Sequence, residues 1–414
     1  MSFLLLVSPR ARLRTAVLAT LLAGLLLVGF QPAQAGAVCP PRFCGVQAWS
    51  TPTATGYERM QEGRVGLFRQ FVFWSNVESA RDSYDWSSTD ANIAGAARAG
   101  IPLLLTLHSA PAYVRGARDD REPPHSDAGR ARFAAFARRA VERYGPVSTE
   151  SGSFWKETGI PPVKVAWQLW NEPNGARYDC PVRNRRCSPK GTPLEYRKLV
   201  QAAAPAIRAV HPGARIGLAG LAETRRGTSI RAYIRGFYGS QRTARRLSRL
   251  FDAVSVHPYA EQPKQVAGAL RDIRALVTRV GDPSARLWLT EIGWGTGGDR
   301  RSFAYATRRE QARKLAGTFG AALSGRRRYD VDMVIWFSLQ DRAPTREEKE
   351  VGHWQPHTGL FDRDGDPKPS WRAFAKVTGG RAGAGVGTAS TAGSPPRALL
   401  RDEAVTVGDE EGGG

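Results

Sequence analysis

The sequence predicts an α/β fold of the (β/α)8 TIM-barrel type, built as a single domain. Three observations lead to this prediction: eight short apolar runs, amphipathic segments between them, and about 340 residues without a linker-like break. The apolar runs are continuous, as expected for strands buried on both faces of a parallel sheet. An open doubly wound sheet is the alternative, but no glycine-rich phosphate fingerprint follows the first run.

The expected strands are separated by enough residues to hold a helix between each pair. They are Val46–Trp49, Val65–Arg69, Pro102–Leu107, Val165–Trp170, Arg215–Ala219, Ala253–His257, Leu287–Thr290 and Met333–Phe337. The clearest helical runs are Asp127–Tyr144, Pro193–Val210 and Arg308–Leu323, whose apolar residues recur at helical spacing. Thr192 and Glu195 have the spacing of a capping box at the start of the second of these helices.

The two ends of the chain differ in composition from the part between them. Residues 1–35 combine arginines, an apolar stretch and the small-x-small sequence Ala33-Gln34-Ala35, which predicts a secretion signal peptide. Residues 379–414 are rich in glycine, alanine and serine, which predicts a disordered tail. Residues 36–378 are therefore expected to form the folded domain of a secreted, extracellular protein without a membrane span after signal cleavage.

Four cysteines form two pairs that are close in sequence, Cys39 with Cys44 and Cys180 with Cys187. An even number in a secreted chain predicts disulfides, and four cysteines allow three connectivities. We expect the two local bridges. Neither spacing is C-x-x-C and no histidine is close by, so a zinc site is not expected.

The formal net charge of +22 is carried mostly by arginine, which is compatible with an anionic partner. The basic residues are scattered over the whole chain and no recognised nucleic-acid-binding motif is found. Nucleic acid is therefore not expected to be a partner.

Polar residues stand where the expected strands end, which is where (β/α)8 enzymes place their catalytic groups. At or just beyond these ends lie Arg69, His108, Asn171, Glu172, His257, Tyr259 and Glu291, and the eighth strand carries Trp336. Glu172 and Glu291 are expected to face each other in one mouth. Two facing carboxyl groups, one protonated and one ionised, are the minimum requirement for glycoside hydrolysis.

Two motifs carry a resemblance to a known group of enzymes. Trp170–Asn174 reads WNEPN, and Thr290–Trp294 reads TEIGW. From about Gly45 to Val377 the chain resembles glycoside hydrolase clan A, the retaining β-glycosidases built on (β/α)8 barrels. Its motif sequences most resemble those of families 39 and 5 and of cellulase-like barrels. The resemblance implies an O-glycosyl hydrolase that acts with retention on a β-linked oligo- or polysaccharide, without a cofactor or metal.

The resemblance also implies a role for each of these residues. Glu172 would be the acid/base and Glu291 the nucleophile. The remaining residues would serve the same subsite: Asn171 bonded to the sugar 2-hydroxyl, Arg69 keeping Glu291 ionised, Tyr259 donating to Glu291, Trp336 as the floor, and His108 and His257 lining the pocket.

Several alternatives stay open. A barrel that binds carbohydrate without cleaving it would be expected to lack one carboxylate, and both are present. A metal-dependent hydrolase would need histidine ligands, but none of the six histidines stands in H-x-H or H-E-x-x-H spacing. His108, His257 and Trp336 could equally be core residues.

The substrate and the oligomeric state are the least constrained expectations. The segment Cys180–Cys187 carries Arg183, Arg185 and Arg186 without an acid, so an anionic polysaccharide is one alternative for the substrate. We expect the protein to be a monomer.

Overall fold

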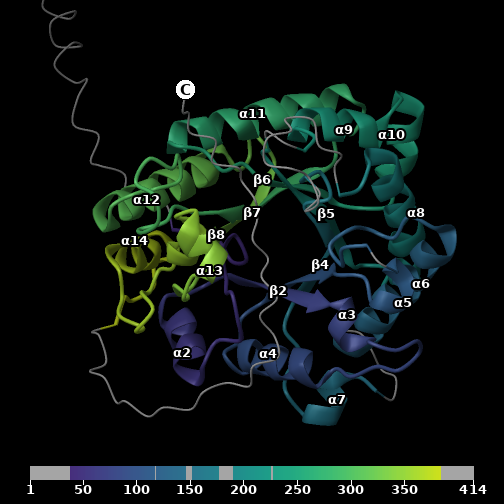
Figure 1. Ribbon diagram of the computed structural model, residues 1–414, viewed down its shortest axis with the longest axis horizontal. Helices are drawn as coiled ribbons and strands as arrows, with labels where there is room; N and C mark the ends of the chain where they lie inside the picture. The colour runs from purple at the N-terminus through teal and green to yellow at the C-terminus, as the bar shows by residue number, and fades with distance from the viewer. Residues whose placement is uncertain (1–37, 117, 146–151, 177–189, 225–226, 384–414) are drawn as a thin grey trace, which may run out of the picture. The chain divides into compact units, whose positions relative to one another are not determined.

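Eight parallel strands close into a barrel in chain order from β1 to β8 (Figure 1). The computed structural model describes residues 38–116, 118–145, 152–176, 190–224 and 227–383. The strands are β1 (Cys44–Gln47), β2 (Leu67–Phe73), β3 (Leu103–His108), β4 (Val165–Asn171), β5 (Arg215–Ala222), β6 (Ala253–His257), β7 (Arg286–Ile292) and β8 (Val331–Phe337). The (β/α)8 prediction is therefore confirmed.

Helices surround the strands in the connections between them (Figure 1). They are α2 (Ala54–Glu62), α3 (Trp74–Val77), α4 (Ser87–Arg98), α5 (Ala112–Arg115), α6 (Asp127–Tyr144), α7 (Phe154–Thr158), α8 (Pro193–Val210), α9 (Ile230–Tyr238), α10 (Gln241–Leu247), α11 (Pro263–Arg279), α12 (Arg308–Gly325), α13 (Arg346–Glu350), the 3-10 helix η1 (Gln355–His357) and α14 (Pro369–Thr378). Among the described residues, no helix combines the length and apolarity that a membrane crossing requires.

Helix boundaries agree with the sequence better than strand boundaries do. Helices α6 and α8 begin and end where expected, and the capping box of Thr192 and Glu195 is present. Strand β2 continues to Phe73, four residues past the expected end, because its pairing with β3 extends to the register of Phe73 with His108. Strand length is set by the partner strand, which the local sequence does not reveal.

The core has two layers, one inside the barrel and one between strands and helices. The inner layer is an apolar cluster of seven buried residues: Leu67, Leu104, Ala166, Ala253, Trp288, Met333 and Ile335. Gly217 makes room for the largest of these, since a Cβ there would lie 2.3 Å from the Trp288 ring. This layer fills the barrel interior, as in other barrels of this type. Function is therefore expected at the mouth, where the inward positions become polar.

The disulfide expected between Cys39 and Cys44 is present, next to the start of β1. Cys180, Cys187 and the arginines between them lie outside the described residues, as do the expected signal peptide and residues 384–414. Residues 379–383, the start of the expected tail, are described. There the Arg381 N–H donates to the Glu62 carbonyl oxygen at 2.8 Å, which joins this segment to the end of α2.

Candidate active site

Arg69 lies at the centre of the polar layer at the barrel mouth and has no exposed surface. Its Nη1 donates to Glu291 Oε1 and to Gln47 Oε1. Its Nη2 donates to Asn171 Oδ1 at 2.8 Å, and its Nε donates to Gln168 Oε1 at 2.9 Å. A buried cation is costly unless it is paired and fully hydrogen-bonded, and here every guanidinium nitrogen has a partner. Arg69 thus ties Glu291 and Asn171 to one rigid support.

Glu291, on β7, receives hydrogen bonds on both carboxylate oxygens. Arg69 donates to Oε1, and the Tyr259 hydroxyl donates to Oε2 at 3.1 Å. Burial, together with the nearby carboxylates of Glu291 and Glu172, raises the pKa of Tyr259 well above its usual range. Tyr259 therefore remains a hydrogen-bond donor at all physiological pH values.

Glu172 follows β4 and is hydrogen-bonded to His257 of β6. The distance from Glu172 Oε1 to His257 Nδ1 is 2.7 Å, and Glu291 Oε2 lies 3.6 Å from the same nitrogen. The other ring nitrogen, Nε2, is 2.9 Å from Thr290 Oγ1. One side of the imidazole, at Nδ1, therefore faces both carboxyl groups, and a hydroxyl on the other side orients the ring.

The two carboxyl groups are close together. One oxygen of Glu172, one oxygen of Glu291 and a nitrogen of His257 all lie within 4.8 Å of one another. In retaining glycosidases the carboxyl groups are about 5–5.5 Å apart, whereas inverting enzymes need about 6.5–9.5 Å to admit a water molecule. The same three groups have the chemistry of cation ligands, but the Arg69 guanidinium already supplies positive charge to Glu291 and would repel a second cation.

The backbone around Glu172 is strained in a way that aims its side chain. Trp170 has φ 74° and Glu172 has φ 42°, values in the left-handed region that non-glycine residues rarely adopt. Each costs on the order of 1–3 kcal/mol and persists because the surroundings impose it. The Trp170 indole donates to the Arg121 carbonyl oxygen at 2.9 Å, and the Glu172 N–H donates to the Gly220 oxygen at 3.0 Å. These contacts allow both Asn171 and Glu172 to lie at the barrel mouth.

Asn174 fixes the loop that follows Glu172. Its Nδ2 donates to the carbonyl oxygens of Ala222 at 2.7 Å and Thr228 at 2.8 Å. Its Oδ1 accepts from the Ala222 N–H at 3.1 Å. The second asparagine of the WNEPN motif therefore joins the end of β4 to the end of β5.

Four residues of the polar layer were not among the expected site residues: Gln47, Thr106, Gln168 and Thr290. Gln168 accepts from Arg69 Nε and from the Thr106 hydroxyl at 2.9 Å, and its Nε2 donates to Thr290 Oγ1 at 3.2 Å. It thereby links the support of Glu291 to the support of His257. The available signal was a polar residue inside an otherwise apolar strand, as in VAWQLW.

Trp336 does not reach the mouth, so its expected role as the subsite floor is wrong. It is fully buried on the outer face of β8, its ring 6.4 Å from that of Phe319 in α12, and its indole donates to the Thr358 oxygen at 3.0 Å. Alternation along the strand gives the inward position to Phe337, in register with Gln47. The Phe337 ring lies 4.5 Å from that of Trp49, between centroids.

His108 lies at the end of β3 and is almost fully buried. Its ring packs edge-on against Trp170, with 4.9 Å between centroids, and tilts against Phe71 at 5.7 Å. These contacts place His108 beside the strained turn that carries Glu172.

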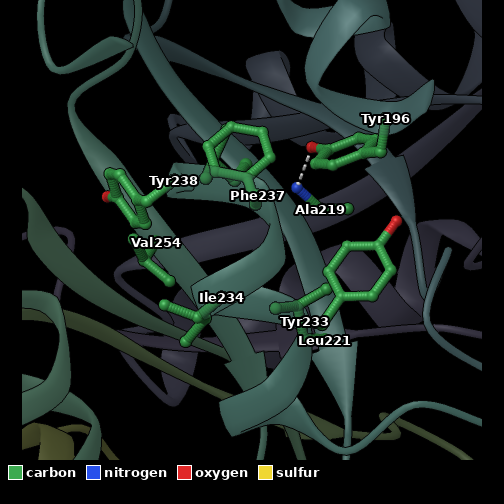
Figure 2. A pocket seen from close by; sticks show the side chains of 9 residues that line it. Tyr196, Ala219, Leu221, Tyr233, Ile234, Phe237, Tyr238 and Val254 are labelled. Carbon is green, nitrogen blue, oxygen red and sulfur yellow. Dashed lines mark hydrogen bonds between the residues drawn. The ribbon is translucent and has the colours of Figure 1, made fainter. Parts of the chain in front are cut away.

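A small cavity lies between β5, β6 and helices α8 and α9 (Figure 2). Its volume is about 10 Å³ and its lining is apolar apart from tyrosine hydroxyls. The Tyr196 hydroxyl is already satisfied, donating to the Leu169 oxygen and accepting from the Ala219 N–H. A cavity of this size and lining is at the lower limit for one water molecule and is a packing void.

No family model matches the chain, and no curated protein matches its sequence. Solved structures match its fold. A family 39 glycoside hydrolase from the gut symbiont Bacteroides cellulosilyticus WH2 has a TM-score of 0.57 at 20% identity, over 82% of this chain and 63% of that one. This chain thus spans less than two thirds of that protein.

Two further structures are similar. A monomeric β-xylosidase from Caulobacter crescentus CB15 has a TM-score of 0.55 at 18% identity, over 82% of this chain and 69% of that one. A GH5_18 protein from Streptomyces cattleya, in complex with Manβ1-4GlcNAc, has a TM-score of 0.58 at 15% identity, over 82% and 80%. The chain therefore has the (β/α)8 fold found in glycoside hydrolases of families 39 and 5, the two families that its motifs resemble.

Proposed function

We propose that this protein is a retaining O-glycosyl hydrolase that cleaves a β-linked oligo- or polysaccharide. The observation that carries the proposal is the pair of buried carboxyl groups at the barrel mouth, with one oxygen of Glu172 and one oxygen of Glu291 within 4.8 Å of each other. This spacing leaves no room for a water molecule between a sugar and the second carboxylate, so direct attack is favoured.

The partners of the two groups support a division of roles. Glu291 accepts from a permanent cation, Arg69, and from a phenol, which favour its charged, nucleophilic form. Glu172 is bonded to an imidazole, which accepts a hydrogen bond from a carboxylic acid or donates one to a carboxylate. Glu172 can therefore serve as acid and then as base.

In the first step the protonated Glu172 gives its proton to the glycosidic oxygen while a Glu291 oxygen attacks the anomeric carbon. The bond to the leaving group breaks and a covalent glycosyl–Glu291 ester forms. In the second step the Glu172 carboxylate takes a proton from water, whose oxygen attacks the anomeric carbon. The ester bond breaks, which returns both carboxyl groups to their starting states. Asn171, held by Arg69, would bind the sugar 2-hydroxyl.

The test is to identify the reaction's stereochemistry and its intermediate. A panel of 2-deoxy-2-fluoro aryl glycosides, including xyloside and mannoside, is expected to label Glu291, as seen by mass spectrometry of the digested protein. Proton NMR of the first product formed from the matching aryl glycoside is expected to show the β anomer. An α product, or a label on another residue, would reject the proposal.

We further propose that the protein is secreted and that the signal peptide ends near residue 35. The Cys39–Cys44 disulfide fits an oxidising compartment. N-terminal sequencing of the protein recovered from culture medium would test this. A full-length chain retained in the cytosol with reduced cysteines would contradict it.

A further inference from the structure

Arginines around much of the barrel lie beside a carboxylate. Arg132 pairs with Asp82 at 2.7 Å, and Arg346 pairs with Glu350 at 2.9 Å. Arg138 and Arg139 both pair with Glu142. In these places the high positive charge of the chain is locally neutralised.

The segment of residues 230–250, which forms α9 and α10, is different. It contains six arginines and no aspartate or glutamate: Arg231, Arg235, Arg242, Arg245, Arg246 and Arg249. All six are exposed. Within the described part of the chain, no ion pair within 4.0 Å joins any of them to a carboxylate, and Arg231 interacts with Glu223 only at longer range. We call these six residues the arginine face.

Helical spacing brings these charges together. Arg231 and Arg235 are four residues apart on α9, and Arg242, Arg245 and Arg246 are three and four apart on α10. The two helices lie next to each other at the outside of the barrel (Figure 1). Like charges at this spacing repel, and a bound anion would relieve that repulsion. Arg235, Arg245 and Arg246 also lie in the last turns of their helices, where the helix dipole favours cations.

The opposite sides of these helices are apolar and face the core. Tyr233, Phe237 and Tyr238 of α9 are buried, as is Leu247 of α10. The segment therefore offers no exposed aromatic ring on which a nucleobase could stack. Its exposed chemistry is planar guanidinium groups, which bind carboxylate and sulfate groups bidentately.

We propose that the arginine face binds an anionic polysaccharide through its carboxylate or sulfate groups. Helix α9 begins next to the mouth, because Thr228, just before it, donates its N–H to the carbonyl oxygen of Asn174 at 2.9 Å. Helix α10 follows the other end of α9, so a polymer bound to α10 would have to lie along α9 to reach Glu172. The choice of a polysaccharide among polyanions rests on the proposed hydrolase function, whereas the cationic face itself does not.

The experiment compares two variants of the full-length protein, each of which loses four positive charges. The first is R242Q/R245Q/R246Q/R249Q, on α10 and just after it. The control is R138Q/R139Q/R271Q/R346Q, four exposed arginines that each lie beside a carboxylate elsewhere on the barrel. Thermal melts establish that both are folded. Calorimetric titration then measures binding of polygalacturonate, of its carboxyl-reduced form and of duplex DNA, at about 0.02 and 0.3 M salt.

Polygalacturonate is expected to bind the wild-type protein at low salt, and this binding is expected to weaken strongly at high salt. The carboxyl-reduced form is not expected to bind. The α10 variant is expected to lose at least about tenfold in affinity, and the control no more than about twofold. Equal losses in both variants would mean that net charge, not this face, binds the polymer. DNA binding of equal strength and equal sensitivity to the α10 variant would reject a glycan site, as would absence of polygalacturonate binding.

The two proposals can fail separately. A wild-type protein that hydrolyses a neutral aryl glycoside but does not bind polygalacturonate would overturn the arginine face alone. A protein that binds polygalacturonate through α10 but never forms the Glu291 ester would overturn the hydrolase alone.

Discussion

One carboxylate oxygen of Glu172 and one of Glu291 lie within 4.8 Å of each other at the barrel mouth, yet the surroundings of the two glutamates differ in kind. Glu291 is held by Arg69, a cation that never loses its proton, and by the hydroxyl of Tyr259. Glu172 is held by His257, whose ring nitrogens either donate or accept. One environment favours a single charge state and the other tolerates both. The chemistry of the partners, more than the position of each carboxyl group, supports the proposed roles of Glu291 as nucleophile and Glu172 as acid/base.

The most severe way to break this comparison is to remove Glu291, the proposed nucleophile. Glu291→Ala is expected to lower kcat by about 10⁴-fold or more, because no other group can form the covalent intermediate. Added azide should restore turnover of an aryl glycoside and give an α-glycosyl azide, since it attacks directly from the space vacated by the carboxylate. Residual activity near the wild-type value, or a β azide product, would place the nucleophile elsewhere.

Removing the other carboxyl group is expected to have an effect that depends on the substrate. Glu172→Ala should lower kcat/KM by about 10²–10⁴-fold for a poor leaving group such as an alkyl alcohol. The first step should be largely spared for dinitrophenyl glycosides, which depart without a proton. Rates measured across a series of leaving groups of increasing acidity would show this as a steep dependence. A uniform loss across the series would contradict the acid/base role.

The hydrogen bond from Tyr259 to Glu291 offers a finer test of the comparison. Tyr259→Phe removes the donor to Glu291 Oε2 while keeping the ring, and kcat is expected to fall by about 10²-fold. The matched control is Tyr57→Phe, which removes a hydroxyl of similar burial that joins α2 to α4 by donating to the Asn92 carbonyl oxygen. Steady-state kinetics should show no change in kcat for the control. Equal losses in both variants would indicate a general effect of buried phenols on folding.

The sequence predicted the fold and the two carboxyl groups because both depend on local signals. Apolar runs mark buried strands, and a glutamate directly after such a run is carried to the mouth by the barrel geometry. Arg69, Asn171, His257 and Tyr259 lie at the mouth for the same reason, and the roles assigned to them stay predictions. The pairing of Cys39 with Cys44 followed from their closeness in the chain.

What the sequence did not show depends on which side of a strand a residue occupies. Trp336 and Phe337 are adjacent aromatics near the end of β8, and a shift of one residue exchanges the inner and outer faces. Gln168 was overlooked because its importance lies in partners from β2, β3 and β7 that are far away in sequence. The strained turn at Trp170 likewise results from contacts with distant segments.

The last prediction concerns stability on the nucleophile side of the mouth. His353 is mostly buried, and the loss of hydration lowers its pKa from 6.5 to about 4. Glu348 raises this pKa, and Arg342 and His357 lower it by smaller amounts. Its ring stacks on Trp354, which in turn contacts Tyr259, the partner of Glu291. Protonation of His353 would therefore act behind Glu291 and not behind Glu172.

The direction in which stability changes with pH follows from proton binding. Between pH 6.5 and about 4 the unfolded chain binds a proton at this histidine that the folded protein does not, so stability falls as the pH falls. The loss between pH 7 and pH 5 is expected to be about 2 kcal/mol. In His353→Phe this part of the pH dependence is absent, and neither ring nitrogen has a hydrogen-bond partner among the described residues that the change would break. Urea unfolding at the two pH values measures the difference. If the variant and the wild type lost equal stability between pH 7 and pH 5, the acid sensitivity would have to come from other groups.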